Sequence, residues 1–404
     1  MEGISAGDTA WVLASAALVM LMTPGLGFFY GGLVQKKNVL STLMHSFFTL
    51  ALVSLIWVLW GYSLAFGPSM GGVIGGLDFF GLNGITPEST TGTIPTMAFV
   101  GFQMMFAAIT PALISGAFAE RKRFKAFVIF TVLWSTIVYA PVAHWVWGGG
   151  WIAELGALDF AGGTVIHITS GVAAIVVALM LGRRKQFGTP ETEPHDLTMT
   201  VLGAALLWFG WFGFNAGSAL GANGLAAHAF VVTNIAAAGG AIAWLGTSWA
   251  RKGHPSVLGA ACGAVAGLVG ITPAAGFVGV WAAILIGIGA GVLCCLAADM
   301  LKSRVRLDDA LDVFAVHGVG GIWGALATGL FADAAIGGTD GLFFGNPEQF
   351  FIQLLAVVVA ALFAAVVTFA ICKIVNALVG LRVPEEDEVL GLDSSQHGEI
   401  AYRT

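Results

Sequence analysis

The stretch ALDFAGGTVIHITSG at residues 157–171 has a counterpart in ALDVFAVHGVGG at residues 310–321, and this pair decides how we expect the chain to fold. Each stretch carries Ala-Leu-Asp, then a histidine, then a glycine four residues after that histidine. The spacing from aspartate to histidine is eight residues in the first stretch and five in the second, so the match is approximate. Because both stretches lie in long apolar runs, they indicate two related halves that each bring a histidine into an apolar helix.

The composition of the chain places it in a lipid bilayer. Of its 404 residues, 57% are hydrophobic and only 10% are charged, whereas a soluble domain has about 25% charged residues. The 57 glycines and 13 tryptophans suit closely packed membrane helices with aromatic anchors at the interface. This composition excludes a soluble enzyme, a nucleic-acid-binding protein and a disordered chain. The four cysteines are uninformative, because they show neither metal-ligand spacing nor a disulfide framework. We expect no metal and no cofactor.

Apolar stretches between polar or turn-rich breaks predict eleven transmembrane helices, each of about 20 residues. They are expected at about 9–34, 39–66, 95–119, 126–147, 163–181, 198–219, 227–250, 257–271, 277–301, 310–332 and 349–379. The eighth helix is short and rich in Gly and Ala, and fusing it with its neighbour would reverse the orientation of everything that follows. The expected fold is an all-α polytopic membrane protein.

The basic residues decide how these helices are counted and oriented. Of the 17 Lys and Arg residues, Lys373 ends helix 11 and the others follow odd-numbered helices or lie in the C-terminal tail, which puts all of them on one side of the membrane. A count of ten or twelve helices would break this separation. The positive-inside rule makes that side cytoplasmic, so we expect a multi-pass protein of the cell membrane with its N-terminus outside and its C-terminus inside. No basic segment precedes the first apolar run, so we expect no cleavable signal peptide.

The outer side carries nine carboxylates and neither Lys nor Arg. They are Glu2, Asp8, Asp78, Glu88, Glu154, Asp159, Asp333, Asp340 and Glu348. The formal net charge of −6 therefore conceals a strong difference between the two sides. Such a face concentrates cations and repels anions. The alternative explanation is that sorting of basic residues to the inside accounts for the whole asymmetry.

The two histidine stretches close successive groups of five helices. Because five is odd, the second group enters the membrane in the opposite orientation, which predicts an inverted 5+5 repeat with one helix appended. Inverted repeats place the substrate path near the membrane midplane at their interface, so helices 5 and 10 should approach each other. We expect a transport domain over 1–380, with repeats at about 9–181 and 198–332 and helix 11 at about 349–379. A cytoplasmic tail at 381–404 follows.

His167 and His317 are the best candidates for pore chemistry, because ionisable groups within the hydrocarbon region are costly and usually functional. A single buried histidine is more often a packed structural residue, but two at matching positions of a repeat favour function. Neutral imidazoles can pass a hydrogen bond or a proton between them, since each has one donor and one acceptor nitrogen. His45, His144 and His228 have no such mate and are expected to be structural.

Aromatic and small residues alternate along several helices. Residues 208–218 read WFGWFGFNAGS, and Phe102 precedes Phe106 by one helical turn. Phe rings at closely packed Gly-rich contacts could constrict a path and exclude water, although aromatic core packing is the commoner explanation. Trp147 fits an interfacial anchor. Alternatively, a tryptophan face with a nearby hydroxyl such as that of Ser218 suits a small cation through cation–π attraction.

The sequence at residues 159–167 (DFAGGTVIH) and 211–218 (WFGFNAGS) resembles the ammonium transporter (Amt/Mep/Rh) family, on its bacterial and archaeal Amt side. Further matching segments cover most of the chain, at 24–31, 107–121, 141–150, 308–321 and 391–402. The resemblance implies a homotrimer with a separate pore in each subunit, and ammonium or its analogue methylammonium as substrate.

The resemblance also implies roles for individual residues near the outer mouth. Phe106, Trp147 and Ser218 match the site that recruits the external cation. Phe106 and Phe214 match the stacked phenylalanine gate beneath that site. Asp159 matches a buried carboxylate that supports recognition, and we interpret it as a helix-capping and electrostatic residue rather than a direct ligand.

His167 and His317 match the twin-histidine pair of the family's pore. A narrow apolar pore cannot replace the hydration shell of ammonium, so passage of the intact ion would cost many kcal/mol. Desolvation lowers the pKa of a cationic acid. The resemblance therefore implies recruitment of the ion, deprotonation near the gate and conduction of NH3 along the histidines, with or without separate transfer of the proton.

Other functions and partners are left open by the residues. Family members can act as ammonium sensors with little net flux, and no kinase or cyclase domain is present within these residues to support that function. A membrane enzyme with the two histidines as metal ligands would need carboxylate or Cys partners at helical spacing, which helices 5 and 10 do not offer at depth, so we expect no enzyme.

By composition the acidic tail is solvated, but its end matches the family's ordered C-terminal region. The resemblance implies a PII signalling protein as a partner at that cytoplasmic face.

Overall fold

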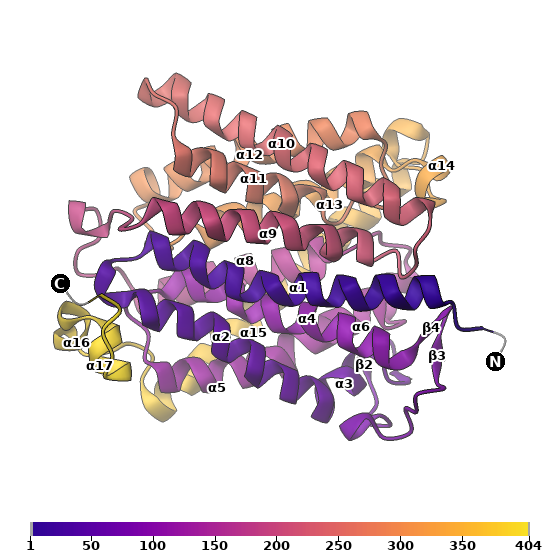
Figure 1. Cartoon of the computed structure of the whole chain (residues 1–404), viewed down its shortest axis with the longest axis horizontal. Helices are drawn as coiled ribbons and strands as arrows, with labels where there is room; N and C mark the ends of the chain where they lie inside the picture. Colours follow the sequence, from indigo (N-terminus) through magenta and orange to yellow (C-terminus); the bar gives the residue numbers. More distant parts are fainter. Residues whose placement is uncertain (1–2, 403–404) are drawn as a thin grey trace.

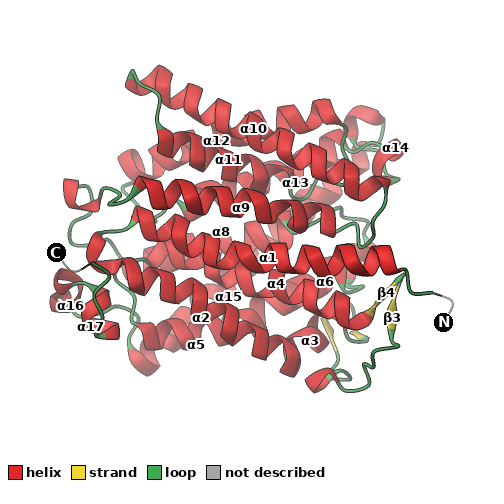
Figure 2. Ribbon diagram, in the orientation of Figure 1, coloured by secondary structure: helices red, strands yellow, loops and turns green. Residues whose placement is uncertain are grey.

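The computed structural model describes residues 3–402 and consists mostly of helices that run alongside one another (Figure 1). The first and last described residues lie at opposite ends of this bundle, as an odd number of membrane crossings requires. Figure 2 shows strands only at the end where the N-terminus lies. They form two short antiparallel hairpins, β1 (Ser69–Met70) with β2 (Ile74–Gly75) and β3 (Thr90–Thr91) with β4 (Ile94–Pro95).

The eleven predicted crossings are all present as helices. The first five are α1 (Ala6–Leu33), α2 (Val39–Ile56) continued by α3 (Tyr62–Phe66), α4 (Thr96–Ile114), α5 (Phe124–Trp134) continued by α6 (Ala140–Trp147), and α8 (Thr169–Leu181). The next six are α9 (Leu197–Gly217), α10 (Gly224–Lys252), α11 (Val257–Ile271), α12 (Val280–Met300), α13 (Gly320–Phe331) and α15 (Pro347–Val379). The described residues contain ten helical segments long and apolar enough to cross a membrane, and α11, although shorter, has the predicted bounds.

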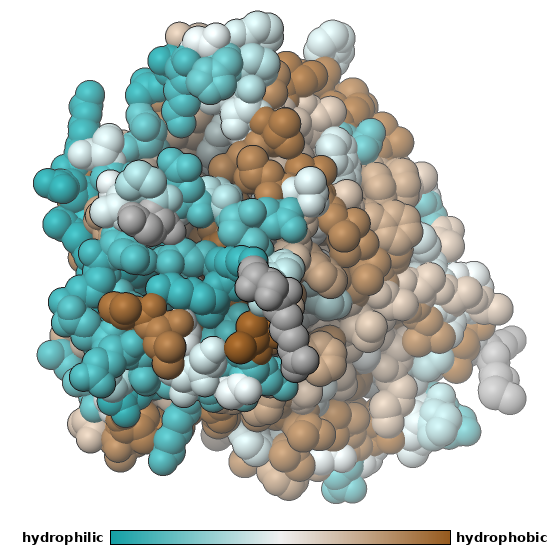
Figure 3. Space-filling model, turned by 60° about the vertical axis from the view of Figure 1, so that its left-hand side comes forward, coloured by the Kyte–Doolittle hydropathy of each residue, from teal (hydrophilic) through white to brown (hydrophobic). Residues whose placement is uncertain are grey.

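Short helices lie outside these crossings. They are α7 (Trp151–Glu154), α14 (Ala334–Gly337), α16 (Glu385–Leu390) and α17 (Leu392–His397). Figure 3 shows hydrophilic residues gathered at the end of the bundle that carries the C-terminus and hydrophobic residues over the adjoining flank. On α15 the exposed side chains include Phe351, Leu362 and Val366. Exposed apolar flanks of this kind suit contact with lipid chains.

Each histidine of the predicted repeat lies on a π-helical turn. His167 is on the turn Gly163–Ile168 that leads into α8, and His317 is on the turn Phe314–Val319 that leads into α13. A π turn inserts an extra residue into a helix and is frequent at functional sites. The two halves therefore present their histidines from the same kind of local structure.

These two stretches also touch backbone to backbone. A Cβ atom added to Gly171 would lie 2.2 Å from the backbone nitrogen of Gly318, and one added to Gly321 would lie 3.0 Å from Cβ of His167. The glycines that follow each histidine by four residues thus allow the halves to meet. This contact is the predicted approach of helices 5 and 10.

The alignment of the repeat at Asp312 is wrong, because Asp309 holds the matching position. Asp309 Oδ2 accepts the backbone N–H of Phe314 at 2.7 Å and so caps the second π turn. It precedes its histidine by eight residues, the same spacing as in the first stretch. Asp312 instead has a left-handed backbone (φ 59°) and pairs with Lys302. The aspartate of the shared Ala-Leu-Asp sequence is therefore not the one that caps the second π turn.

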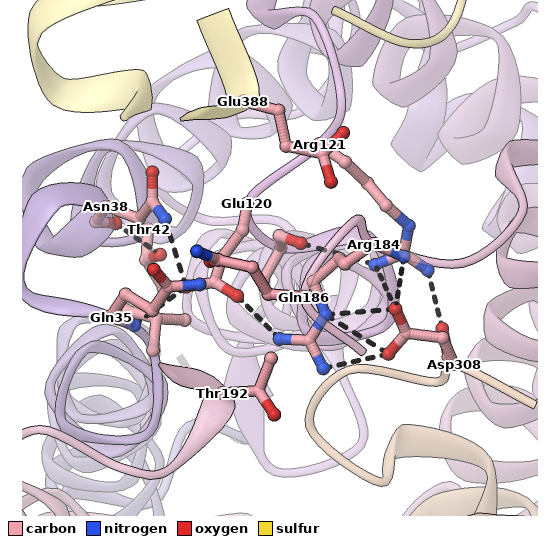
Figure 4. A network of polar contacts seen from close by, with 12 residues as sticks. Gln35, Asn38, Thr42, Glu120, Arg121, Arg184, Gln186, Thr192, Asp308 and Glu388 are labelled. Carbon is pink, nitrogen blue, oxygen red and sulfur yellow. Dashed lines mark hydrogen bonds and ion pairs between the residues drawn. The ribbon is translucent and has the colours of Figure 1, made fainter. Parts of the chain in front are cut away.

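A buried ion network joins the loops at the C-terminal end of the bundle (Figure 4). Arg184 contacts both carboxylate oxygens of Asp308 at 2.8–3.1 Å and Oε2 of Glu120 at 2.5 Å. Arg121 donates from Nη2 to the backbone oxygen of Asp308 at 2.5 Å. Burial opposes ionisation of Asp308, but Arg121 and Arg184 hold its pKa below the usual value. The network fixes the cytoplasmic ends of three crossings relative to one another.

The C-terminal tail packs against the start of α2. Asp393 accepts the backbone N–H groups of Leu40 at 3.0 Å and Ser41 at 2.8 Å, which caps that helix. The backbone N–H of Leu392 donates to Oδ1 of Asn38 at 2.8 Å, and Leu392 and Asp393 are both buried. The tail is therefore ordered here, whereas its acidic composition alone indicated a solvated segment.

Lys122 is a buried lysine that destabilises the folded protein to an extent that depends on pH. It is 1% exposed, and its Nζ has no hydrogen-bond partner among the described residues but lies 3.9 Å and 3.8 Å from the ring centroids of Phe118 and Phe130. Burial lowers the pKa of Lys122 to about 7. The unfolded chain therefore holds a proton on Lys122 that the folded chain lacks from about pH 7 up to the ordinary lysine pKa, so the destabilisation that Lys122 causes decreases as pH rises through that window.

We expect Lys122→Met to raise the apparent melting temperature more at pH 6 than at pH 9. The gain in the free energy of unfolding on Lys122→Met should be larger at pH 6 than at pH 9 by at most about 3 kcal/mol. The two ring faces partly favour the charged form of Lys122, which keeps the difference below that limit. Thermal unfolding of purified protein at both pH values checks this. A Lys122→Met effect that is the same at both pH values, or larger at pH 9, would contradict it.

Candidate functional site

A pocket of about 300 Å³ opens near the N-terminal end of α4. It is lined by Phe66, Phe99, Gln103, Phe106, Val146, Trp147, Phe160, Ser218 and Leu220. All three residues predicted to recruit a cation, Phe106, Trp147 and Ser218, are among these nine. The fold thus brings together side chains from α4, from α6 and from the end of α9.

The polar atoms of Trp147 and Ser218 are held by the backbone. Trp147 Nε1 donates to the backbone oxygen of Asp159 at 2.8 Å, and its ring meets that of Phe106 edge-on at 6.1 Å. Ser218 Oγ donates to the backbone oxygen of Phe214 at 2.8 Å. Because that bond uses the hydroxyl proton, the lone pairs of Ser218 remain as acceptors. The pocket thus offers aromatic surface and a hydroxyl acceptor, which suits a small cation.

Two stacked phenylalanines lie between this pocket and a second cavity deeper in the bundle. The ring centroids of Phe106 and Phe214 lie 4.4 Å apart at an angle of 37°, and both residues are 1% exposed. Phe106 lines the outer pocket, whereas Phe214 lines a second cavity deeper in the bundle. The two rings therefore separate the outer pocket from the inner cavity.

The inner cavity is narrow and mostly apolar. Its volume of about 20 Å³ holds little more than one water-sized molecule. The lining residues are Met22, Leu26, Phe29, Tyr30, Ile109, Leu113, Ile166, His167, Leu207, Trp211, Phe214, Val265, Leu311, Val313, Val316 and His317. The hydroxyl of Tyr30 donates to the backbone oxygen of Leu113, which leaves the two imidazoles as the main polar surface.

His167 and His317 contact each other within this cavity. Their Nδ1 atoms are 3.2 Å apart, their ring centroids are 5.2 Å apart, and they are 1% and 3% exposed. One Nδ1 must donate and the other must accept, so the pair has opposite tautomers. One Nε2 then carries a proton and the other carries a lone pair. The pair can therefore offer one donor and one acceptor to a neutral polar molecule.

Trp211, which the sequence did not single out for this site, supports His167. Its ring stacks on that of His167 at 5.5 Å and 22°, and its Nε1 donates to Oγ1 of Thr272 at 2.9 Å. Trp211 lies one turn before Phe214 on α9, so helical spacing on the aromatic run could have indicated that both face the same cavity.

Asp159 caps the turn that carries His167. Its carboxylate accepts four backbone N–H groups, from Gly162 and Gly163 at Oδ1 and from Thr164 and Val165 at Oδ2, over 2.7–3.1 Å. It is 8% exposed and does not line either cavity. With both oxygens engaged, the carboxylate positions this turn and, through its backbone oxygen, Trp147.

The three histidines expected to be structural lie away from this path. His144 contacts the backbone oxygen of Ala65 and Oγ of Ser69, and His228 contacts the backbone oxygen of Val278. His45 is buried among aromatic rings and both of its nitrogens lack a partner among the described residues. None of the three lines the outer pocket or the inner cavity.

Known proteins match this sequence along nearly its whole length. A sequence profile described as the Ammonium Transporter Family matches residues 10–402. The chain is 55% identical over 401 residues to the ammonium transporter of Bacillus subtilis (strain 168), covering 98% of both chains. It is 50% identical over 399 residues to the ammonium transporter Amt1 of Archaeoglobus fulgidus, covering 99% of this chain and 100% of the relative.

Two solved structures have the same fold as this chain. Saccharomyces cerevisiae Mep2 superposes with a TM-score of 0.92 at 40% identity, covering 100% of this chain and 92% of that one. A protein titled Sensor Amt Protein superposes with a TM-score of 0.90 at 31% identity, covering 97% of this chain and 98% of that one. The fold is thus shared along nearly the whole chain by both proteins.

Proposed function

Because this chain belongs to the Ammonium Transporter Family, we propose that it carries ammonium inward across the cell membrane. It is a multi-pass membrane protein of a transporter family rather than an enzyme. The observation that carries the proposal is the order of parts along one path: an aromatic outer pocket, a phenylalanine pair, and a narrow apolar cavity that contains two histidines.

Ammonium is first held in the outer pocket. The faces of Trp147 and Phe106 attract the cation, and the lone pairs of Ser218 accept one of its N–H groups. This recruitment is reversible, because none of the described residues that line the pocket carries a carboxylate to hold the ion tightly.

The phenylalanine pair then excludes the hydrated ion. Phe106 and Phe214 leave no room for a water shell, and transfer of a bare ion into a medium of low dielectric costs on the order of 20 kcal/mol in the idealised limit. Loss of solvent lowers the pKa of ammonium. The ion therefore transfers its proton near the gate to a water molecule of the outer pocket, and neutral NH3 enters the inner cavity.

The histidine pair supports NH3 once it has entered. NH3 can donate to the free Nε2 lone pair and accept from the Nε2–H group, so it passes an apolar cavity without losing all its hydrogen bonds. The same pair offers a path for a proton between the imidazoles, which would make transport electrogenic.

Assembly and regulation follow the family. We propose that three copies assemble, each with its own pore, and that a PII signalling protein binds the cytoplasmic face where the ordered tail lies. A second candidate function is an ammonium sensor with little net flux, which the similarity to the protein titled Sensor Amt Protein favours.

Uptake of labelled methylammonium into vesicles that contain the purified protein separates these functions. We expect uptake well above that of protein-free vesicles, and inhibition by unlabelled ammonium. Binding of methylammonium by folded protein without uptake would favour the sensor. Neither binding nor uptake by folded protein would contradict both.

A further inference from the structure

Gln103 is a polar residue of the outer pocket to which the proposed mechanism gives no role. It lies on α4 three residues before Phe106, so the two side chains share a helix face and Gln103 is one turn nearer the outer end. It is 9% exposed. Of the nine residues that line the pocket, only Gln103, Trp147 and Ser218 have polar side-chain atoms.

The amide oxygen of Gln103 is unsatisfied. Oε1 is buried and has no hydrogen-bond partner among the described residues. A buried polar atom left without a partner costs about 1–3 kcal/mol, so such atoms in a native protein call for an explanation. Rotation about the last side-chain bond exchanges the oxygen and the nitrogen of the amide within the same volume, so the oxygen can face the pocket.

The other polar groups of this region cannot take its place as acceptors. Trp147 Nε1 is a donor that is already used by the backbone oxygen of Asp159. The Asp159 carboxylate is occupied by four backbone N–H groups. Ser218 offers lone pairs at one point only. Ammonium carries four N–H donors, so a second acceptor is needed once the ring faces and Ser218 are engaged.

We propose that Gln103 is a substrate ligand of the outer pocket, whose amide oxygen accepts an N–H group of ammonium. The inference rests on the proposed transport function and adds a residue that determines affinity. A neutral amide binds the cation more weakly than a carboxylate does, which suits a site that must also release it. Because the contact is made before the gate, it acts on binding rather than on the later passage of NH3.

Two replacements of nearly the same size test this role with opposite expected signs. Gln103→Leu removes the acceptor and should raise the apparent KM for ammonium about tenfold, with little change in the maximal rate, since a hydrogen bond to a charged group is worth about 1.5 kcal/mol or more. Gln103→Glu adds a charge and should lower the apparent KM and slow release. Met104→Leu is the matched control, because this neighbour on α4 does not line the pocket.

The measurement is ammonium transport by vesicles over a range of concentrations, with melting temperatures recorded for each variant. A wild-type KM in Gln103→Leu would overturn the inference, and so would equal KM changes in Gln103→Leu and Gln103→Glu, which indicate a packing role. If Gln103→Leu does not fold, Gln103→Glu decides: an unchanged or raised KM overturns the inference. Failure of the wild-type protein to transport ammonium would instead overturn the proposed function.

Discussion

Replacing His167 and His317 together by leucine is expected to lower the rate of ammonium transport by about tenfold or more. The two imidazoles are the main polar surface of a cavity otherwise lined by apolar side chains. Without them NH3 would lose both hydrogen-bond partners inside the bundle, and each lost bond costs about 1 kcal/mol or more. The maximal rate should fall more than the apparent KM rises, because the outer pocket is left intact.

Transport of ammonium, methylammonium and K⁺ into vesicles measures this effect and any change in selectivity. His228→Gln is the matched control, because that histidine lies outside both cavities and its hydrogen bond to the backbone oxygen of Val278 can be kept. If the double replacement leaves both the rate and the selectivity at wild-type values in folded protein, the histidines have no role in conduction.

Asp159→Ala is expected to cause a large loss of stability. The carboxylate satisfies four backbone N–H groups at the start of the turn that carries His167. Its removal leaves these donors buried without partners, which should cost at least about 3 kcal/mol. The same turn fixes His167, and the backbone oxygen of Asp159 holds Trp147. Transport should therefore fall together with the melting temperature.

Asp196 provides the control for this prediction. It also caps a helix, accepting the backbone N–H of Met199 at 2.9 Å at the start of α9, but it is partly exposed. Asp196→Ala should cost about 1 kcal/mol, as an ordinary N-cap does. Asp159→Asn, which keeps one acceptor oxygen, should fall between the two. Equal melting temperatures for Asp159→Ala and wild-type protein would rule out the structural role.

The sequence predicted the helical framework well because its signals are strong and additive. Apolar length gave the crossings, and the one-sided placement of basic residues required the short helix that α11 forms at Val257–Ile271. The repeated histidine and glycine marked the crossing point of the halves, where Gly171 meets Gly318. These features depend on local composition or on fixed spacing, which a sequence displays directly.

Contacts between distant segments were harder to predict. Capping depends on backbone geometry, so the letters Ala-Leu-Asp pointed to Asp312, whereas the π turn places Asp309 as the cap. The acidic tail is ordered because Asp393 meets the free N–H groups of α2, a segment more than 350 residues away. Gln103 looks like an ordinary helix residue until Phe106 and Ser218 are seen to share its pocket.

The most direct test of the account is an ammonium pulse applied to vesicles that contain the purified protein and a pH indicator. We expect a fast, saturable change in internal pH or membrane current that protein-free vesicles lack and that the His167→Leu, His317→Leu double replacement reduces about tenfold or more. A response from folded wild-type protein that is indistinguishable from protein-free vesicles would contradict the claim that ammonium crosses the membrane by this path.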